Sequence, residues 1–455
     1  MTAWQQGSIV EVTIVDLSNS GDGVGRWQGR VVFVPDTVPG DQIRARLIQV
    51  KSSFARGKLL QLLQPSQQRV RPACIVADKC GGCQWQPVAY TAQLVAKQQL
   101  VAAALSRIGG FQQVPLSRIL AAASPLGYRN KATYPLVRSP TGQVKAGYYR
   151  KGSHKLVNLN QCPVQDVRLN PLLADIKADI QQQGWSIYSE SAQQGRLRHL
   201  SLRIGRRTGQ MLVTLVSAQP TVPDLEHWAA IWLERYPQLV GVCLNHNPAK
   251  TNVIFGPTTT CLAGQPYLEE QFAGLWFHIT PTTFFQIHTE QAERLLEVIQ
   301  TELALQGSET VIDAYCGVGS LTLPLAQRAQ HCIGLEVQPE AVEQARQNAA
   351  RNGLTNVEFQ AGDVGQLLPQ VAQTLPQPPA VVVLDPPRRG CDRTVLEALI
   401  ALRPQRIAYM SCNPATLARD LQQLCQQGGY QLQAVQPADF FPQTAHVECV
   451  AFLVA

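Results

Sequence analysis

From about Thr283 to the C-terminus, apolar segments of strand length alternate with helical segments. Five of the apolar segments are followed at once by a residue that can bind or react: Asp313, Glu336, Asp363, Asp385 and Cys412. Strands that alternate with helices predict a parallel sheet covered by crossover helices. The carboxyl ends of such strands meet at one edge, where ligands bind. We therefore predict an α/β, Rossmann-like fold over residues 283–455, with a site at that edge.

The first of these strands leads into a glycine-rich turn, in DAYCGVGSLTLPLA. Gly317 and Gly319 let the backbone approach a ligand closely. The turn has neither the G-x-G-x-x-G pattern of a dinucleotide site nor the Lys and Ser/Thr of a P-loop. Glu336 stands where a carboxylate takes both hydroxyls of a ribose, and Asp363 where one receives an adenine amino group. Acidic residues at three successive strand ends favour S-adenosylmethionine; the alternative is that they cap helices.

The fourth and fifth strands carry residues suited to chemistry. Asp385 precedes two prolines, which stiffen the loop that follows it. Methyltransferases that act on amino groups place an aromatic residue after these prolines. Here Arg388 and Arg389 follow them, which disfavours an exocyclic amine as substrate. Cys412 precedes a predicted helix, and a thiol at a helix N-terminus with arginines nearby is expected to be held as its thiolate.

Cys412 is placed to attack a pyrimidine ring; the alternative is a buried structural thiol. Carbon-5 of a pyrimidine is a poor nucleophile, but a thiolate that adds to carbon-6 turns the ring into an enolate that accepts a methyl group from a sulfonium. A base must then remove the carbon-5 proton before the thiol leaves. We predict Glu448 as this base. His446, two residues earlier, is expected on the same face of one strand.

The motifs DAYCGVGSLTLPLA, LDPPR, SCNPATLARD and the terminal HVE together resemble the RNA uracil-carbon-5 methyltransferases, and within them the branch that acts on 23S ribosomal RNA. The resemblance implies that Cys412 is the nucleophile, that Glu448 is the base and that Asp385 holds the cofactor or the uracil edge. It also implies cofactor contacts by Gln286, Tyr315, Ser320, Glu336 and Asp363. The family often has Asn where this chain has Ser320.

Four of the 12 cysteines form a pattern of their own. Cys74, Cys80 and Cys83 lie in CIVADKCGGC, and Cys162 follows in NQCPVQ. A three-plus-one arrangement is typical of thiolate-held iron–sulfur clusters, and the spacing alone leaves a tetrahedral zinc site open. Because the ribosomal branch of the family binds a 4Fe-4S cluster at matching cysteines, the resemblance implies one here. Scattered cysteines such as Cys332 are interpreted as small core residues.

Residues 1–64 contain short apolar segments separated by turn sequences such as SNSGDGVG and DTVPGD. Several short strands in so few residues predict a small closed barrel, because closure removes exposed edges. The resemblance implies an RNA-binding barrel of the TRAM type, which is OB-like. We predict an iron–sulfur and RNA-binding α+β domain over residues 65–282, and the methyltransferase domain over residues 283–455. A helix predicted over residues 89–108 is expected to pack on the latter.

Charge is distributed unevenly along the chain. Residues 1–210 hold 27 basic and 10 acidic side chains, whereas residues 211–455 hold 12 and 22. The basic excess favours RNA as a partner; the alternative is a solubilising surface. Within it, Tyr128 to Lys131 (YRNK) form a basic-aromatic stretch expected to contact phosphates and stack on bases. The alternative for this stretch is a solvated loop.

No run of apolar residues is long enough to span a membrane, and no export signal is evident, so we expect a cytoplasmic monomer. The expected partner is 23S ribosomal RNA, with the target uridine flipped out of its stack to reach Cys412. Two alternatives remain: methylation of a transfer RNA or of another ribosomal uridine, and an inert iron–sulfur protein that only binds RNA. The usual transfer-RNA enzymes of the family lack the barrel and the cysteines, which favours ribosomal RNA.

Overall fold

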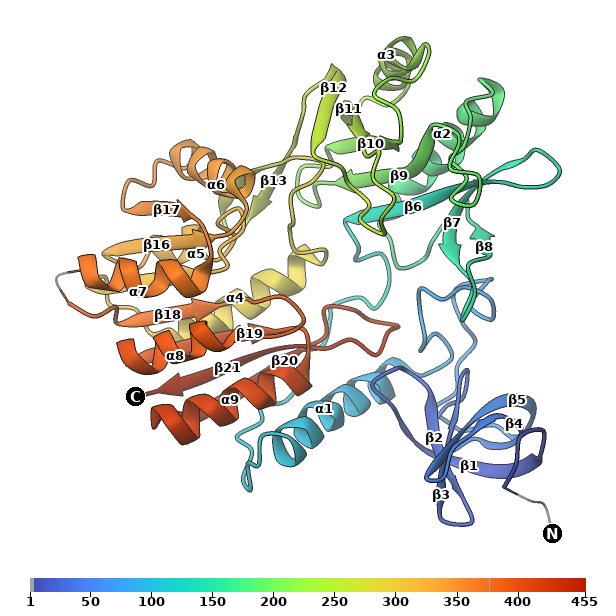
Figure 1. Cartoon of the computed structure of the whole chain (residues 1–455), viewed down its shortest axis with the longest axis horizontal. Helices are drawn as coiled ribbons and strands as arrows, with labels where there is room; N and C mark the ends of the chain where they lie inside the picture. Colours follow the sequence, from blue (N-terminus) through green and yellow to red (C-terminus); the bar gives the residue numbers. More distant parts are fainter. Residues whose placement is uncertain (1–3, 376) are drawn as a thin grey trace.

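The computed structural model describes residues 4–375 and 377–455. In these residues the chain forms a closed barrel, two seven-stranded sheets with their helices, and a two-stranded hairpin. Figure 1 shows the barrel in blue at one end, the central sheet in green beside it, and the C-terminal sheet in orange and red on the other side.

The barrel closes in the order β1-β2-β3-β5-β4. Its strands are β1 (Ile9–Leu17), β2 (Gly23–Trp27), β3 (Arg30–Val34), β4 (Gln42–Val50) and β5 (Phe54–Gln64). The predicted small barrel is confirmed. The segment of β2 was interpreted as a turn because it is rich in glycine, yet it pairs with β1. A Cβ atom at Gly25 would stand 2.2 Å from Cγ1 of Val12, so glycine is needed where these strands cross closely.

The central sheet has the order β12-β11-β10-β9-β6-β7-β8 and is antiparallel except between β10 and β11. Its strands are β6 (Lys131–Arg138), β7 (Val144–Tyr149), β8 (Leu156–Asn158), β9 (Leu197–Ile204), β10 (Met211–Ser217), β11 (Leu239–His246) and β12 (Thr258–Gly264). The helices α2 (Leu169–Gln182) and α3 (Leu225–Arg235) pack on it through buried apolar side chains such as Leu173 and Trp232. This region therefore mixes helices and strands, as predicted.

The C-terminal sheet has the order β17-β16-β15-β18-β19-β21-β20. Its parallel strands are β15 (Thr310–Ala314), β16 (His331–Glu336), β17 (Val357–Ala361), β18 (Val381–Leu384) and β19 (Arg406–Ser411); β20 (Gln431–Ala438) and β21 (Glu448–Val454) complete it. The helices are α4 (Thr289–Leu303), α5 (Thr322–Ala326), α6 (Pro339–Arg351), α7 (Val364–Thr374), α8 (Arg393–Leu402) and α9 (Pro414–Gly428). Strand order reverses between β15 and β18, which is where open α/β sheets bind ligands.

Two segments from earlier in the chain pack on this C-terminal sheet. The hairpin β13 (Leu268–Phe272) and β14 (Leu275–Ile279) places Phe272 and Phe277 in the same core as Val311. The helix α1 (Tyr90–Arg107) packs on α9 (Figure 1). The domain boundaries at residues 64 and 282 stay predictions. The hairpin precedes residue 282 in the chain, yet it packs in the core of the C-terminal sheet. In the described ranges, no helix is long and apolar enough to cross a membrane.

Candidate functional site

The carboxyl edge of the C-terminal sheet gathers the residues predicted to do chemistry. Asp385 directly follows β18, Cys412 directly follows β19, and Glu448 is the first residue of β21. Ser411 pairs with Cys449 across β19 and β21, so Cys412 and Glu448 stand next to each other at the same edge. Gln286 comes from the loop before α4, and its Nε2 lies 3.5 Å from Oδ2 of Asp385.

Cys412 is half-buried, and burial is the main reason why its pKa is raised to about 11. The negative charges of Glu448 and Asp385 raise this pKa further, while Arg388 lowers it through its charge and a hydrogen bond. The prediction that the environment favours the thiolate is therefore wrong for the site without substrate. A helix N-terminus and one arginine do not offset burial beside two carboxyl groups.

The two carboxyl groups at this edge are also hard to ionise. Burial first, and then the charge of Asp385, raise the pKa of Glu448 well above its usual range, and Arg388 opposes the shift. Burial raises the pKa of Asp385 to about 7. Glu448 is only 4% exposed. A raised pKa is typical of carboxyl groups that take part in proton transfer at functional sites.

Arg388 connects these groups to His446. Its Nη2 lies 2.8 Å from Nδ1 of His446. Partial burial and the charge of Arg388 lower the pKa of His446 to about 4, so the ring is neutral near pH 7. β21 begins at Glu448, so His446 precedes the strand and does not share its face, contrary to the prediction. These contacts leave Glu448, not His446, as the group with raised proton affinity beside Cys412.

The glycine-rich turn lies at the same edge. Tyr315 has a φ of +71°, which is strained for a residue other than glycine, and strain of this kind is concentrated at functional sites. Gly317 donates its backbone N–H to Glu336 Oε2 at 3.1 Å, and Gln338 donates to the other oxygen at 2.9 Å. The half-buried carboxylate of Glu336 is thus held in a fixed orientation at the end of β16. Apart from its chain neighbours, no described residue comes within 4 Å of a Cβ placed on Gly317, so the space above the turn is open.

The other residues predicted to contact the cofactor lie around this turn. Asp363 caps α7, because its side chain accepts a hydrogen bond from the Gln366 N–H at 3.2 Å, as the helix-capping alternative expects. Its side chain is nevertheless exposed and remains accessible to a ligand. Gln286 and Ser320 line one small cavity, together with Phe440. Asp313 is buried, and its Oδ1 has no hydrogen-bond partner among the described residues.

The four clustered cysteines line a separate cavity of about 80 Å³. Cys80 and Cys162 are buried and Cys74 and Cys83 half-buried. Burial, with added effects of neighbouring cysteines, raises the pKa of Cys83 to about 12 and that of Cys162 to about 11. In residues 4–375 and 377–455, however, no group of three or more Cys, His, Asp or Glu side chains has the arrangement to hold a metal ion.

Two buried donors face the cysteine cavity. Gln86 and Arg129 both line it, and Nε2 of Gln86 and Nε of Arg129 have no partner among the residues described. Unpaired buried donors are costly, so each calls for an explanation, such as an acceptor that the cavity takes up. Sulfide or thiolate sulfur is an acceptor of this kind. The donors therefore fit a thiolate-bound group, although the cysteines do not yet have a ligating arrangement.

The stretch from Tyr128 to Lys131 does not form the RNA contact that we predicted. Tyr128 is 2% exposed, stacks on His288 and donates its hydroxyl to the Pro442 carbonyl at 3.0 Å. Asn130 donates Nδ2 to the Gln286 carbonyl at 2.9 Å and to Thr289 Oγ1 at 3.0 Å. The stretch is neither a solvated loop nor a base-stacking platform: it attaches the central sheet to the loop that carries Gln286.

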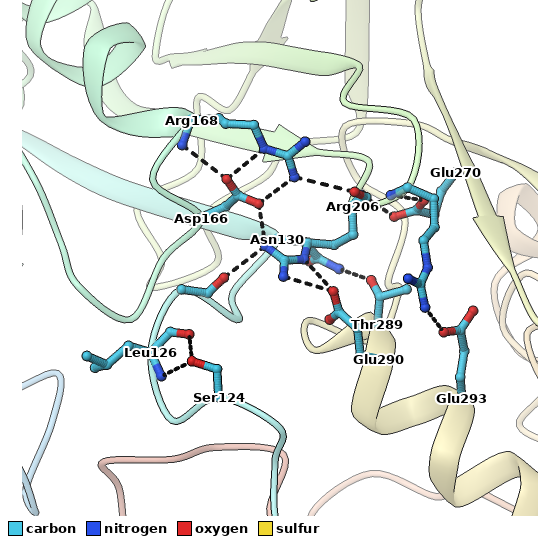
Figure 2. Close-up of polar contacts among 12 residues, drawn as sticks. Ser124, Leu126, Asn130, Asp166, Arg168, Arg206, Glu270, Thr289, Glu290 and Glu293 are labelled. Carbon is cyan, nitrogen blue, oxygen red and sulfur yellow. Dashed lines mark hydrogen bonds and ion pairs between the residues drawn. The ribbon is translucent and has the colours of Figure 1, made fainter.

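Figure 2 shows that this attachment continues through charged side chains. Arg206 forms ion pairs with Asp166 and, at the start of α4, with Glu290. Elsewhere Arg203 is 5% exposed and donates to the carbonyl of Thr283. Part of the basic excess in the first half of the chain is therefore internal, and the outward positive charge is smaller than the sequence count indicates.

One buried pair was not predicted. Lys97 and Asp439 are each 0% exposed in their side chains, and their Nζ and Oδ1 atoms are 2.5 Å apart. Sequence reasoning missed them because Lys97 stands in a helix of alternating polar and apolar residues, where a lysine is expected at the surface. The one signal was Asp439 itself, an acidic residue directly before the apolar pair Phe440 and Phe441.

Comparison with known proteins identifies the family. The model for tRNA (Uracil-5-)-methyltransferase matches residues 89–366, the TRAM domain model matches residues 3–60, and a general methyltransferase domain model matches residues 305–429. An uncharacterized RNA methyltransferase of Nostoc sp. is 62% identical over 453 residues, covering 100% of this chain and 98% of the relative. One of Synechocystis sp. is 56% identical, covering 99% and 97%.

Among solved structures, the Pyrococcus abyssi tRNA (uracil-54, C5)-methyltransferase in complex with S-adenosyl-L-homocysteine matches with a TM-score of 0.77 and 27% identity. The match covers 98% of this chain and 100% of the archaeal protein. The barrel, the central region and the C-terminal sheet are thus all included in one family architecture. The chain belongs to the family of S-adenosylmethionine-dependent RNA uracil-5-methyltransferases, with a TRAM domain at its N-terminal end.

Proposed function

We propose that this RNA methyltransferase transfers a methyl group from S-adenosylmethionine to carbon-5 of one uridine, with Cys412 as nucleophile and Glu448 as base. The observation that carries the proposal is the placement of Cys412, Asp385 and Glu448 at one sheet edge beside the glycine-rich turn. A thiol and a carboxyl group of raised proton affinity, side by side, are what a covalent route through carbon-6 requires.

The raised pKa of Cys412 sets the first step. Its thiol must lose a proton as it adds to carbon-6, and the neighbouring carboxylate of Asp385 takes this proton, which leaves Glu448 ionised for the last step. Arg388 donates to the sulfur and stabilises its negative charge. After methylation, ionised Glu448 takes the carbon-5 proton, the ring double bond re-forms, and the bond between carbon-6 and the Cys412 sulfur breaks, which returns the thiolate.

S-adenosylmethionine, when bound, supplies an electrophilic methyl group on its sulfonium. We propose that Glu336 binds the ribose hydroxyls, because two backbone amides already hold its carboxylate in place. The contacts proposed for the remainder of the cofactor come from residues around the same turn and cavity: Gln286, Tyr315, Ser320, Asp363 and Asp385.

We propose 23S ribosomal RNA as the substrate, on the resemblance of the catalytic motifs and the cysteine pattern to the ribosomal branch. A transfer RNA is the second candidate, and a specific observation favours it. The archaeal enzyme that matches 98% of this chain is described as acting on uracil-54 of transfer RNA. The match covers almost the whole chain, including the barrel, so a barrel also has a counterpart in an enzyme described as acting on transfer RNA. The argument that a barrel favours ribosomal RNA therefore fails.

We propose that Cys74, Cys80, Cys83 and Cys162 bind a 4Fe-4S cluster. The shared cavity and the two unpaired donors, Gln86 and Arg129, support this assignment. Among the described residues the cysteines lack the arrangement to hold a metal ion, so their side chains must rearrange to ligate the cluster. Zinc is the alternative, and anaerobic isolation separates the two, because a 4Fe-4S cluster gives a brown protein with four irons per chain whereas zinc gives a colourless one.

The activity is tested by mapping 5-methyluridine in 23S ribosomal RNA and in transfer RNA from a strain that lacks the gene. Loss of one ribosomal 5-methyluridine, restored by the wild-type gene and not by Cys412→Ala, supports the proposal. Loss confined to transfer RNA identifies the second candidate. If neither RNA changes and the purified protein binds RNA without labelling it from radioactive S-adenosylmethionine, the chain is an inert RNA-binding protein.

A further inference from the structure

The loop between β20 and β21, residues 439–447, delivers Glu448 to the site; we call it the base loop. It has no helix or strand, yet most of its residues are buried. Gln443 has a φ of +71°, which costs conformational energy for a side chain of this kind. A strained, buried and irregular loop keeps its shape only if its surroundings hold it.

One anchor of the base loop is Lys97, on α1. Its ammonium donates to Asp439 Oδ1 at 2.5 Å and to the Phe441 carbonyl at 2.9 Å. The indole ring of Trp85 lies 5.8 Å from the same ammonium. Lys97 thus binds both a side chain and the backbone at the start of the loop, and both partners of the ion pair are excluded from water.

A second anchor is Gln93, one helical turn before Lys97 and on the same face of α1. Its Nε2 donates to Oε1 of Gln443 at 3.1 Å, and its Oε1 accepts the Gln443 N–H at 2.9 Å. Gln443 also accepts, through its carbonyl, from the Trp85 N–H at 2.9 Å. The strained residue of the loop is therefore bonded on its side chain and on both sides of its backbone.

These anchors come from outside the sheet that carries the site. Trp85, Gln93 and Lys97 precede the central sheet in the chain, and α1 lies along α9 beneath the C-terminal sheet (Figure 1). From the catalytic half, His288 contacts the Phe440 carbonyl at 3.2 Å. The loop that leads into Glu448 is thus held by a helix that precedes the central sheet in the chain.

We propose that Lys97 and Gln93 are positioning residues, which hold the base loop so that Glu448 reaches the carbon-5 proton after methyl transfer. The inference rests on the proposed function, in which Glu448 is the base. A buried ion pair adds little to stability compared with packed apolar residues of the same volume. It does fix geometry, and a shift of about 1 Å in a reacting group slows a step by roughly 100-fold.

The test separates addition from release. Lys97→Met alone leaves Asp439 buried without its partner and can unfold the chain, so the informative variant is K97M/D439N, which removes both charges. With RNA that contains ordinary uridine and with S-adenosylmethionine, we expect this variant to accumulate a methylated adduct that survives denaturing gels, at roughly 10 times the wild-type level or more. With 5-fluorouridine RNA, where release is blocked, we expect adduct formation within about threefold of wild type. Gln93→Leu should show the same pattern more weakly.

The matched control is R406M/E309Q. Arg406 and Glu309 pair at 3.1 Å at the start of β19, the opposite end of the strand that precedes Cys412. This double change removes an ion pair from the same sheet without touching the base loop, so it should leave release unchanged. The proposal is overturned if the control accumulates adduct to the same extent, or if K97M/D439N slows addition and release in equal proportion. If wild-type protein forms no adduct with 5-fluorouridine RNA, the proposed function fails and the positioning question does not arise.

Discussion

The cysteine cavity and the catalytic edge present the same side chain in two settings. In both, burial is the main cause of a raised thiol pKa: to about 12 for Cys83 and to about 11 for both Cys162 and Cys412. The neighbours differ. An arginine lowers the thiol pKa at both places, Arg129 at the cavity and Arg388 at the edge. The charges that raise it come from other thiols around the cavity and from two carboxyl groups around Cys412.

Burial alone therefore does not distinguish the cysteines proposed as metal ligands from the cysteine proposed as nucleophile. When a metal binds to several neighbouring thiols, it takes the place of their protons, which are released together. A single thiol beside a carboxylate passes its proton to that neighbour when an electrophile arrives. The partners of each thiol, rather than its exposure, distinguish the two roles, and the following changes act on each set of partners separately.

The largest effect is expected from Cys412→Ala. Removing a nucleophile typically lowers turnover by roughly 10⁴-fold or more, so methyl transfer to RNA should fall below detection. The substitution removes one half-buried sulfur and should leave iron content and folding intact. Radioactive methyl transfer and iron analysis on the same preparation check this. Wild-type activity in Cys412→Ala would show that Cys412 is not the nucleophile.

Glu448→Gln should lower turnover by about 10²–10⁴-fold, the usual contribution of a general base. Unlike Cys412→Ala, it should still form the covalent adduct and then fail to release it. Gel analysis under denaturing conditions measures the trapped fraction. A variant that forms no adduct at all would place Glu448 in addition rather than in proton removal.

Cys83→Ala should act on the other site alone. We expect it to lose iron and its brown colour and to lower the free energy of unfolding, because metal binding in such sites is coupled to folding. The protein that remains folded should keep methyl transfer within roughly tenfold of wild type. The cysteine cavity can affect turnover only through packing, and we expect this to lower turnover less than the loss of the base in Glu448→Gln does. Cys243→Ala, at a buried cysteine outside the cavity, is the control and should retain its iron.

The pH dependence is expected to be gradual, at most tenfold for each pH unit. Because the pKa of Cys412 is raised to about 11, the thiolate is the minor form near neutral pH and its fraction grows with pH. The rate of adduct formation with 5-fluorouridine RNA should therefore rise from about pH 7 to about pH 9. Arg388 lowers this pKa, so Arg388→Met should be slower throughout. A flat profile for the wild type would mean that ionisation of the thiol by solvent does not limit its addition to the ring.

Much of the catalytic edge could be predicted from the sequence because most of the parallel strands have an apolar interior and end at or directly before a polar residue. β16 ends at Glu336, and β19 ends one residue before Cys412. Such strands are buried on both faces, so their ends are marked by composition alone. The barrel was predictable for a related reason, although β2 was missed because its glycines indicate a turn.

What could not be predicted depends on contacts between residues far apart in the chain. Asn130 bonds to Gln286, 156 residues later, and Lys97 bonds to Asp439, 342 residues later. A local pattern such as YRNK has the same composition whether it faces RNA or the protein interior. The raised pKa of Cys412 was missed for the same reason, because Glu448 reaches it only through the pairing of β19 with β21.

The central claim is that Cys412 attacks carbon-6 of the target uridine. Mapping the adduct formed with 5-fluorouridine RNA tests it most directly, because fluorine at carbon-5 cannot leave as a proton does and the complex is trapped. Protease and nuclease digestion followed by mass spectrometry should locate the nucleotide on the peptide that contains Cys412, in SCNPATLARD. Attachment to any other cysteine, or an equal yield of adduct from Cys412→Ala, would contradict the account.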